Sequence, residues 1–187
     1  MTRHRPDRYG CVAVILHWAI AAAIFGLLAS GFAAAGATDP AVKAAILRVH
    51  LPLGAAVLAL TLLRLVRTLR ELRAGTRPGP VEDVPRWQHL AARATHVLLY
   101  VVPLGAAASG IGLVALSGAG PLIFGGGTLP DFWAFAPRIP HGIGARLLVL
   151  LVAIHTAAAL YHHFVRRDGL LRRMWPVSTA SASPHQP

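Results

Sequence analysis

Long uncharged, apolar segments dominate the chain and alternate with short clusters of arginine. The longest apolar segments cover residues 11–38, 94–130 and 147–165, and a shorter one covers 49–63. The short segment reaches a membrane-spanning length if the charged side chains at its ends extend toward the interface. A transmembrane helix needs about 20 predominantly apolar residues, and no segment alternates with the period of two residues typical of barrel strands. The pattern predicts an all-α integral membrane protein, a four-transmembrane-helix bundle with spans near residues 11–35, 44–67, 90–116 and 141–165.

These spans are expected to form one domain over residues 1–176, followed by a Pro- and Ser-rich tail at 177–187 that we expect to be disordered. The first apolar segment is too long for a secretory signal, whose hydrophobic region covers about 7–15 residues. The glycine-rich stretch GAGPLIFGGG at 118–127 follows a span and is predicted to be an external loop.

Positive charge is distributed unevenly between the two ends of the predicted spans. Charged residues make up only 13% of the chain, about half the share found in soluble domains. Fourteen arginines flank one side of the spans, whereas the other side carries only Lys43, Arg48 and Arg138. The positive-inside rule therefore predicts that both termini are cytoplasmic. The net charge of +11 would also suit a nucleic-acid partner, but arginines gathered at span ends are typical of topology signals, so we expect membrane lipid and no nucleic acid.

The histidines inside or at the rims of the spans fall at two depths. The outer level holds His50 and His141, and the inner level holds a larger set: His17, His96, His155 and His162. Along the fourth span, His141 and His155 share one helix face, about 21 Å apart along the axis. His155 and His162, seven residues apart, share that face too. The chain has one cysteine and no CxxCH motif, which excludes an internal disulfide and covalent haem attachment.

Paired imidazoles at two depths suit two non-covalent haems, each with its iron held by two histidines. Three alternatives stay open for individual histidines. A single histidine in a span is commonly an interhelical hydrogen-bonding residue. Zinc requires three or four ligands at one point, and a proton relay would need Asp or Glu within the spans, where none occurs.

Four stretches carry a family resemblance: RYGCVAVILHW in the first span, RVHLPLG in the second, ATHVLLYVVPLG in the third and HGIGARLLVLLVAIHTAAALYHHFVRRDGLLRRMWP at the end. In this order they resemble the bacterial cytochrome b561 family, which is similar to the dihaem cytochrome b subunits of nickel–iron hydrogenases. The resemblance covers about residues 8–176. It implies a protein of the bacterial inner membrane with two haem b groups. The small four-helix members of the family are superoxide oxidases that pass electrons from superoxide to ubiquinone.

Transferred to this sequence, the resemblance makes four histidines axial ligands of haem iron. His17 and His155 would bind the inner haem, and His50 and His141 the outer haem.

The resemblance places His96 and His162 near the inner haem or a bound quinone. Two features depart from the family pattern. Pro52 stands where the family often has a polar residue, and Arg146 is not expected at its position. Arg146 is a candidate partner for a haem propionate, or its side chain simply extends to the interface. No catalytic residue can be assigned.

The resemblance thus predicts an oxidoreductase that transfers electrons from superoxide to ubiquinone. On the outer side, Lys43, Arg48 and Arg138 face Asp39 and Asp131, which leaves a net charge of +1 and a weak attraction for an anion. One alternative is a haem b membrane anchor for a redox partner subunit of the hydrogenase or dehydrogenase type. Another is a haem-free membrane scaffold or transporter.

Overall fold

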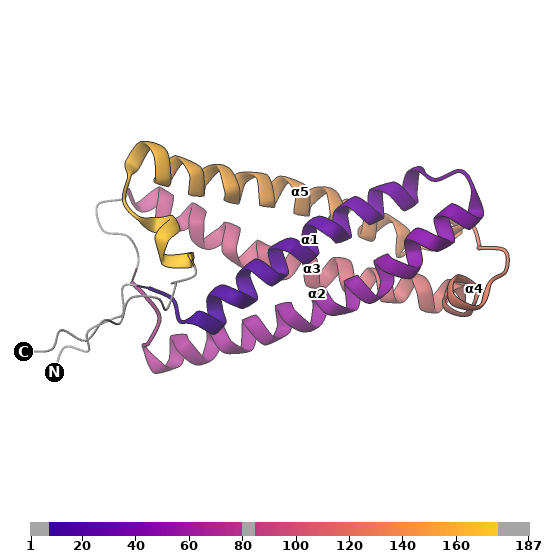
Figure 1. The fold of residues 1–187 in the computed structure, drawn as a ribbon, viewed down its shortest axis with the longest axis horizontal. Coiled ribbons are helices and arrows are strands. Elements are labelled where there is room, and N and C mark those ends of the chain that lie inside the picture. The colour runs from indigo at the N-terminus through magenta and orange to yellow at the C-terminus, as the bar shows by residue number, and fades with distance from the viewer. Residues whose placement is uncertain (1–7, 80–84, 176–187) are drawn as a thin grey trace, which may run out of the picture.

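The computed structural model describes residues 8–79 and 85–175, so the predicted disordered tail at 177–187 lies outside the described residues. Within these ranges there is no strand, and four helices are long and apolar enough to cross a membrane. They are α1 (Cys11–Gly36), α2 (Pro40–Ala74), α3 (Arg86–Ser117) and α5 (Arg138–Tyr161), the last extended by the π-helical turn η2 (His162–Arg166) (Figure 1). Each predicted span lies inside one of them, which confirms the all-α transmembrane bundle.

The four helices form two antiparallel pairs, α1 with α2 and α3 with α5. A short turn joins the first pair, and α2 begins where the Asp39 carboxylate accepts hydrogen bonds from the backbone N–H groups of Ala41 and Val42. Such a cap satisfies N–H groups that lack an intrahelical partner. At its other end, α2 stops at Gly75, whose φ of 67° is the left-handed conformation that favours glycine. The two pairs contact each other mainly through α2 and α3.

The apolar core lies in the middle of the bundle and draws on both helix pairs. Ile20 and Ile24 of α1 meet Val57 of α2 and Leu148 of α5. Many other large apolar side chains point outward, as shown by Phe25, which is 60% exposed. A lipid environment accounts for this distribution, because hydrocarbon tails solvate apolar side chains while the helices satisfy their own backbone groups.

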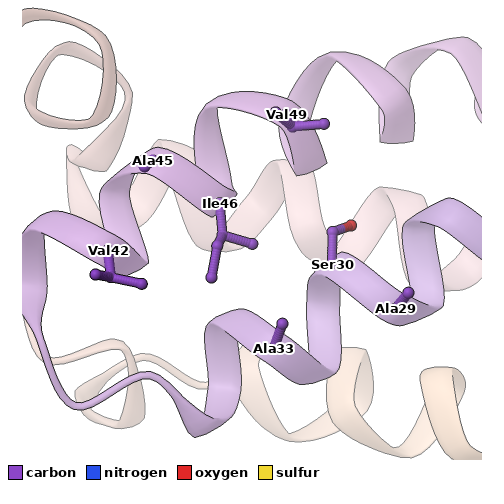
Figure 2. A pocket seen from close by; sticks show the side chains of 7 residues that line it. All are labelled: Ala29, Ser30, Ala33, Val42, Ala45, Ile46 and Val49. Atoms are coloured by element: carbon purple, nitrogen blue, oxygen red, sulfur yellow. The ribbon is translucent and has the colours of Figure 1, made fainter.

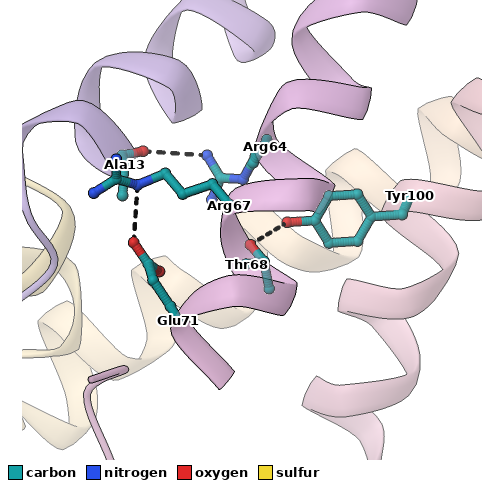
Figure 3. Close-up of polar contacts among 6 residues, drawn as sticks. All are labelled: Ala13, Arg64, Arg67, Thr68, Glu71 and Tyr100. Carbon is teal, nitrogen blue, oxygen red and sulfur yellow. Dashed lines mark hydrogen bonds and ion pairs between the residues drawn. The ribbon is translucent and has the colours of Figure 1, made fainter. Parts of the chain in front are cut away.

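The first turn of α1, the end of α2, the start of α3 and the end of α5 lie together at what we call the arginine-rich end (Figure 1). The 3₁₀ helix η3 (Leu170–Met174) folds back there onto α1, where Trp18 Nε1 donates a hydrogen bond to the Met174 carbonyl at 2.8 Å. Nearby, the Thr68 and Tyr100 hydroxyls are 3.1 Å apart and join α2 to α3 (Figure 3). An Arg67–Glu71 ion pair of 2.8 Å lies on the same part of α2.

The other end of the bundle, away from the arginine-rich end, is what we call the opposite end. It carries the α1–α2 turn, the short helix α4 (Ala119–Gly125) and the 3₁₀ turn η1 (Phe132–Ala134). The glycine-rich segment predicted as a loop thus contains a helix. Ala119 and Ile123 are fully buried, because this segment has apolar side chains that find cover against α2 and α3. Arg48 of α2 fastens it by donating from Nε to the Ile123 carbonyl at 2.6 Å.

Candidate functional site

Two histidines from different helix pairs face each other near the opposite end. His50 lies on α2, ten residues after the helix begins, and His141 lies in the first turn of α5. Their ring centroids are 6.2 Å apart and their ring planes are inclined by 80°.

A second pair lies toward the arginine-rich end and has almost the same geometry. His17 of α1 and His155 of α5 have ring centroids 6.2 Å apart and planes inclined by 71°. His96 of α3 approaches the same His155 ring more closely, with a centroid distance of 5.4 Å. The structure therefore brings together three of the four histidines assigned to the inner level.

The geometry of the two pairs fits a metal ion between the rings. Two metal–nitrogen bonds of about 2 Å each, added to two imidazole radii, give a centroid separation of about 6 Å. The 6.2 Å separations match this distance, whereas the 5.4 Å between His96 and His155 is shorter. Within residues 8–79 and 85–175, no group of three or more His, Cys, Asp or Glu side chains is placed to hold a metal ion.

Both histidine pairs bridge the boundary between the helix pairs. Neither α1 nor α2 packs extensively against α5, although α5 supplies one member of each histidine pair. A flat macrocycle needs this kind of boundary, because its faces must meet side chains and its edges must pass between helices. The residues present therefore fit two haem groups with bis-histidine ligation, and the ligand assignment itself stays a prediction.

The apolar core separates the two levels. Leu148 is seven residues from His141 and seven from His155, so it lies on the same face of α5 midway between them, and it is only 2% exposed. Ile20 and Ile24 follow His17 along α1 and pack in the same cluster.

Arg64 of α2, one of the fourteen arginines taken as topology signals, is also a charged neighbour of the inner level. It interacts electrostatically with His17, His96 and His155. Its Nη1 also lies 3.4 Å from the Ala13 carbonyl of α1, to which it donates (Figure 3). A guanidinium forms good hydrogen bonds with carboxylates such as haem propionates. Its position inside the apolar stretch LLRLV was the available signal.

Two more guanidinium groups lie beside the outer level. Arg146 Nη1 donates to the Gly142 carbonyl at 3.0 Å, and Arg138 stacks over the Trp133 ring at 4.4 Å. Both reach the glycine that follows His141, since a Cβ atom on Gly142 would lie 3.0 Å from Arg138 Nη1 and 3.2 Å from Arg146 Nη1. The assignment of Arg146 to a propionate stays a prediction.

His162 lies apart from the inner trio, beyond the end of α5. Its ring interacts with the adjacent Tyr161, and its Nδ1 is 2.5 Å from an oxygen of Asp168, which also accepts from the Leu170 N–H. Partial burial raises the pKa of the Asp168 carboxyl, but hydrogen bonds from His162 and Leu170 outweigh it and hold this pKa below its usual value. His162 therefore has a carboxylate partner outside the membrane-spanning segment, and its predicted quinone role stays a prediction.

An open apolar groove on the exposed surface of α1 and α2 is lined by none of these histidines. Figure 2 shows its lining: Ala29, Ser30, Ala33, Val42, Ala45, Ile46 and Val49. Only Ser30 connects the groove to the outer level, because its hydroxyl lies 3.0 Å from His50 Nδ1. This serine and the similar Ser109 beside His141 were not among the predicted site residues. The available signal was the tripeptide Ala-Ser-Gly, which occurs at both 29–31 and 108–110.

Comparison with known proteins gives consistent results. A family model described as prokaryotic cytochrome b561 matches residues 8–177. Cytochrome b561 homolog 2 of Escherichia coli (strain K12) is 28% identical over 183 residues, which cover 94% of this chain and 95% of that protein. Cytochrome b561 homolog 1 of the same organism is 34% identical over 105 residues, so the match covers 53% of this chain and a little over half, 59%, of that relative. A probable superoxide oxidase, CybB, of Yersinia pestis is 23% identical over 174 residues, covering 90% of this chain and 96% of that protein.

Proposed function

The chain belongs to the prokaryotic cytochrome b561 family of membrane cytochromes b, and on this premise we propose that it is a superoxide oxidase of the bacterial inner membrane. It would hold two haem b groups, oxidise superoxide at the opposite end and reduce ubiquinone at the arginine-rich end. The observation that carries the proposal is the pair of facing imidazoles, 6.2 Å between centroids, repeated at two levels of one bundle.

These distances support the ligand assignment. His50 and His141 would hold the outer haem, and His17 and His155 the inner one. When bound, the haems supply two one-electron redox centres at different depths of the membrane. The chain's own residues orient these centres and keep water away from the space between them, which Leu148, Val57 and Ile24 fill. His96 and Arg64 are neighbours of the inner pair rather than ligands.

Superoxide as the electron donor is supported by the printed name of the Yersinia pestis relative and by the basic residues at the opposite end. The balanced reaction is two superoxide anions, one ubiquinone and two protons giving two dioxygen molecules and one ubiquinol. Arg138 lies one helical turn from His141 and is held by the Trp133 ring, so it would attract the anion toward the exposed edge of the outer site.

The protons for quinone reduction would enter at the arginine-rich end, which the positive-inside rule predicts to be cytoplasmic. His162 and Asp168 lie at this end, joined by their 2.5 Å hydrogen bond. The Asp168 carboxylate fixes Nδ1–H as the donor on that side of the His162 ring. Nε2 would then be the nitrogen that carries a proton to a quinone oxygen.

The decisive experiment uses the purified full-length protein in detergent. We expect about two haems per chain and sharp bis-imidazole bands in the reduced-minus-oxidised spectrum. Enzymatically generated superoxide should reduce the haems, and added ubiquinone should reoxidise them. A protein that binds both haems but ignores superoxide, and instead accepts electrons from a co-purifying dehydrogenase, would replace this proposal with a membrane-anchor function. A protein without haem would support a scaffold or transporter.

A further inference from the structure

Each histidine of the outer pair rests against a Ser-Gly step of its antiparallel neighbour. We call Ser30–Gly31 of α1 and Ser109–Gly110 of α3 the two imidazole seats. The α1 seat supports His50 of α2, and the α3 seat supports His141 of α5. The same local structure thus occurs once in each helix pair.

In the α1 seat, glycine makes room for the ring and serine bonds its edge. A Cβ atom on Gly31 would lie only 3.0 Å from His50 Cε1 and 3.5 Å from Nδ1, but 3.9 Å from Nε2. The Ser30 hydroxyl donates to the Gly26 carbonyl at 2.8 Å, so its lone pair is available to accept from His50 Nδ1–H at 3.0 Å. The Leu27 carbonyl also lies close enough to His50 to interact.

The α3 seat has the same parts with a different acceptor. A Cβ atom on Gly110 would lie 3.0 Å from His141 Cε1 and 4.0 Å from Nε2. His141 Nδ1–H donates to the Ala106 carbonyl at 2.9 Å, and the Ser109 hydroxyl donates to the same carbonyl at 2.8 Å. The hydroxyl itself is further from the ring, at 3.4 Å from Nδ1.

We propose that the two imidazole seats are positioning elements that set the tautomer and the ring plane of the outer histidines. In both seats Nδ1 carries the proton and faces the neighbouring helix, so Nε2 is left with a lone pair directed away from the seat. The two rings, each held by a different helix pair, meet at 80°. This inference rests on the proposed function, since it takes the outer haem as the group that both Nε2 atoms would bind.

The serine contacts have an electronic consequence. An imidazole whose N–H donates a hydrogen bond is a stronger base at its other nitrogen, which favours ferric over ferrous iron. Removing the acceptor should therefore raise the reduction potential of the outer haem. Ser30 should matter more than Ser109, because His141 keeps its 2.9 Å bond to the Ala106 carbonyl without the hydroxyl. His50 would keep only the looser approach to the Leu27 carbonyl.

The glycines are tested by Gly31→Ala and Gly110→Ala in the full-length, haem-loaded protein. Matched controls are Gly36→Ala on α1 and Gly105→Ala on α3, where a new Cβ atom would meet nothing within 4 Å. We expect the seat variants to change the anisotropy of one low-spin ferric EPR signal, which depends on the angle between the axial ring planes, or to lose one of the two haems. The controls should keep both signals and both haems. Seat variants indistinguishable from their controls would overturn the proposal.

The serines are tested by redox titration, which remains decisive if a glycine variant fails to fold. Ser30→Ala should shift the reduction equilibrium of one haem by up to about tenfold, equivalent to about 59 mV for one electron. The potential should shift upward in Ser30→Ala and by a smaller amount in Ser109→Ala. In Ser30→Thr, which retains a hydroxyl, the potential should stay near that of wild type. Unchanged potentials in Ser30→Ala would overturn the proposed role of the hydroxyl. A wild-type protein that binds only one haem would instead overturn the proposed function.

Discussion

Charge reversal at Arg138 tests whether an anion is guided to the outer site. At the opposite end, Arg138 is a better target for substitution than Arg48. The Arg48 side chain is bound to the Ile123 carbonyl, so replacing Arg48 would release α4. The two nearby acids already serve as helix caps, Asp39 for α2 and Asp131 for η1. Arg138→Glu reverses one charge beside His141 and changes the net charge of this face from +1 to −1.

The size of the effect follows from Coulomb's law. A superoxide anion about 10 Å from the guanidinium interacts with it by about 0.4 kcal/mol in water. Charge reversal therefore changes the interaction by about 0.8 kcal/mol, which slows the bimolecular reaction about fourfold, since about 1.4 kcal/mol corresponds to a factor of ten. At 0.1 M salt the Debye length is about 10 Å, so the interaction falls to about one third and the slowing to less than twofold.

The assay is stopped-flow reduction of the haems by superoxide at several ionic strengths. Two variants separate charge from packing. Arg138→Gln neutralises the charge without reversing it, and Arg138→Lys keeps the charge while weakening the contact with Trp133. We expect the second-order rate to follow the order wild type, Lys, Gln, Glu at low salt and to converge at high salt. A slowing that persists at high salt, or that is as large in Lys as in Glu, would refute the electrostatic explanation.

Three further predictions concern the inner pair, the core and the arginine-rich end. His17→Ala should lose the inner haem while His96→Ala retains it, because only the His17 ring lies about 6 Å from the His155 ring, the separation expected for two ligands of one iron. Haem quantification checks this, and the reverse result would make His96 the ligand and His17 the neighbour. Leu148→Ala should lower the free energy of unfolding by about 2–5 kcal/mol by opening a cavity between the two levels, measured by thermal unfolding in detergent, and an unchanged stability would place the core elsewhere. Asp168→Asn should speed hydrogen exchange in 168–175 at neutral pH. Because the pKa of Asp168 is lowered, wild type should show the same loosening only in acid, as the pH falls through the folded-state pKa. Equal exchange in both proteins at pH 7 would contradict this prediction.

The membrane spans could be predicted closely because hydropathy acts along one segment at a time. Each predicted span falls within one helix, and the largest differences are at α2, which begins before the predicted residue and continues to Ala74. The helix α4 was not predicted, because its stability depends on contacts with α2 and α3 rather than on its own sequence pattern. Ile123 is buried against other helices and held by Arg48, which lies 75 residues earlier in the chain.

The candidate site was predictable where helical spacing alone determines which residues share a face. Depth along the spans was enough to predict that His50 pairs with His141, and the structure places the two ring centroids 6.2 Å apart. The surroundings of the rings were not predictable in this way. The approach of Arg64 to the inner histidines and the contact of Ser30 with His50 depend on the rotation of one helix against another, which no periodicity within a single span reveals.

The division of labour among the helices links cofactor binding to folding. Helix α5 supplies one histidine to each pair, yet it packs extensively only against α3. Its attachment to α1 and α2 would therefore depend largely on the haems bound between the paired histidines. A ligand that binds only the folded state adds about 4 kcal/mol of stability when present at a thousand times its dissociation constant. Two such ligands on opposite sides of Leu148 would fix both the position of α5 and its rotation, because a helix held at two points about 21 Å apart on one face cannot turn without breaking one contact. The imidazole seats on α1 and α3 would then hold the outer rings in the orientation that this haem-mediated attachment of α5 requires.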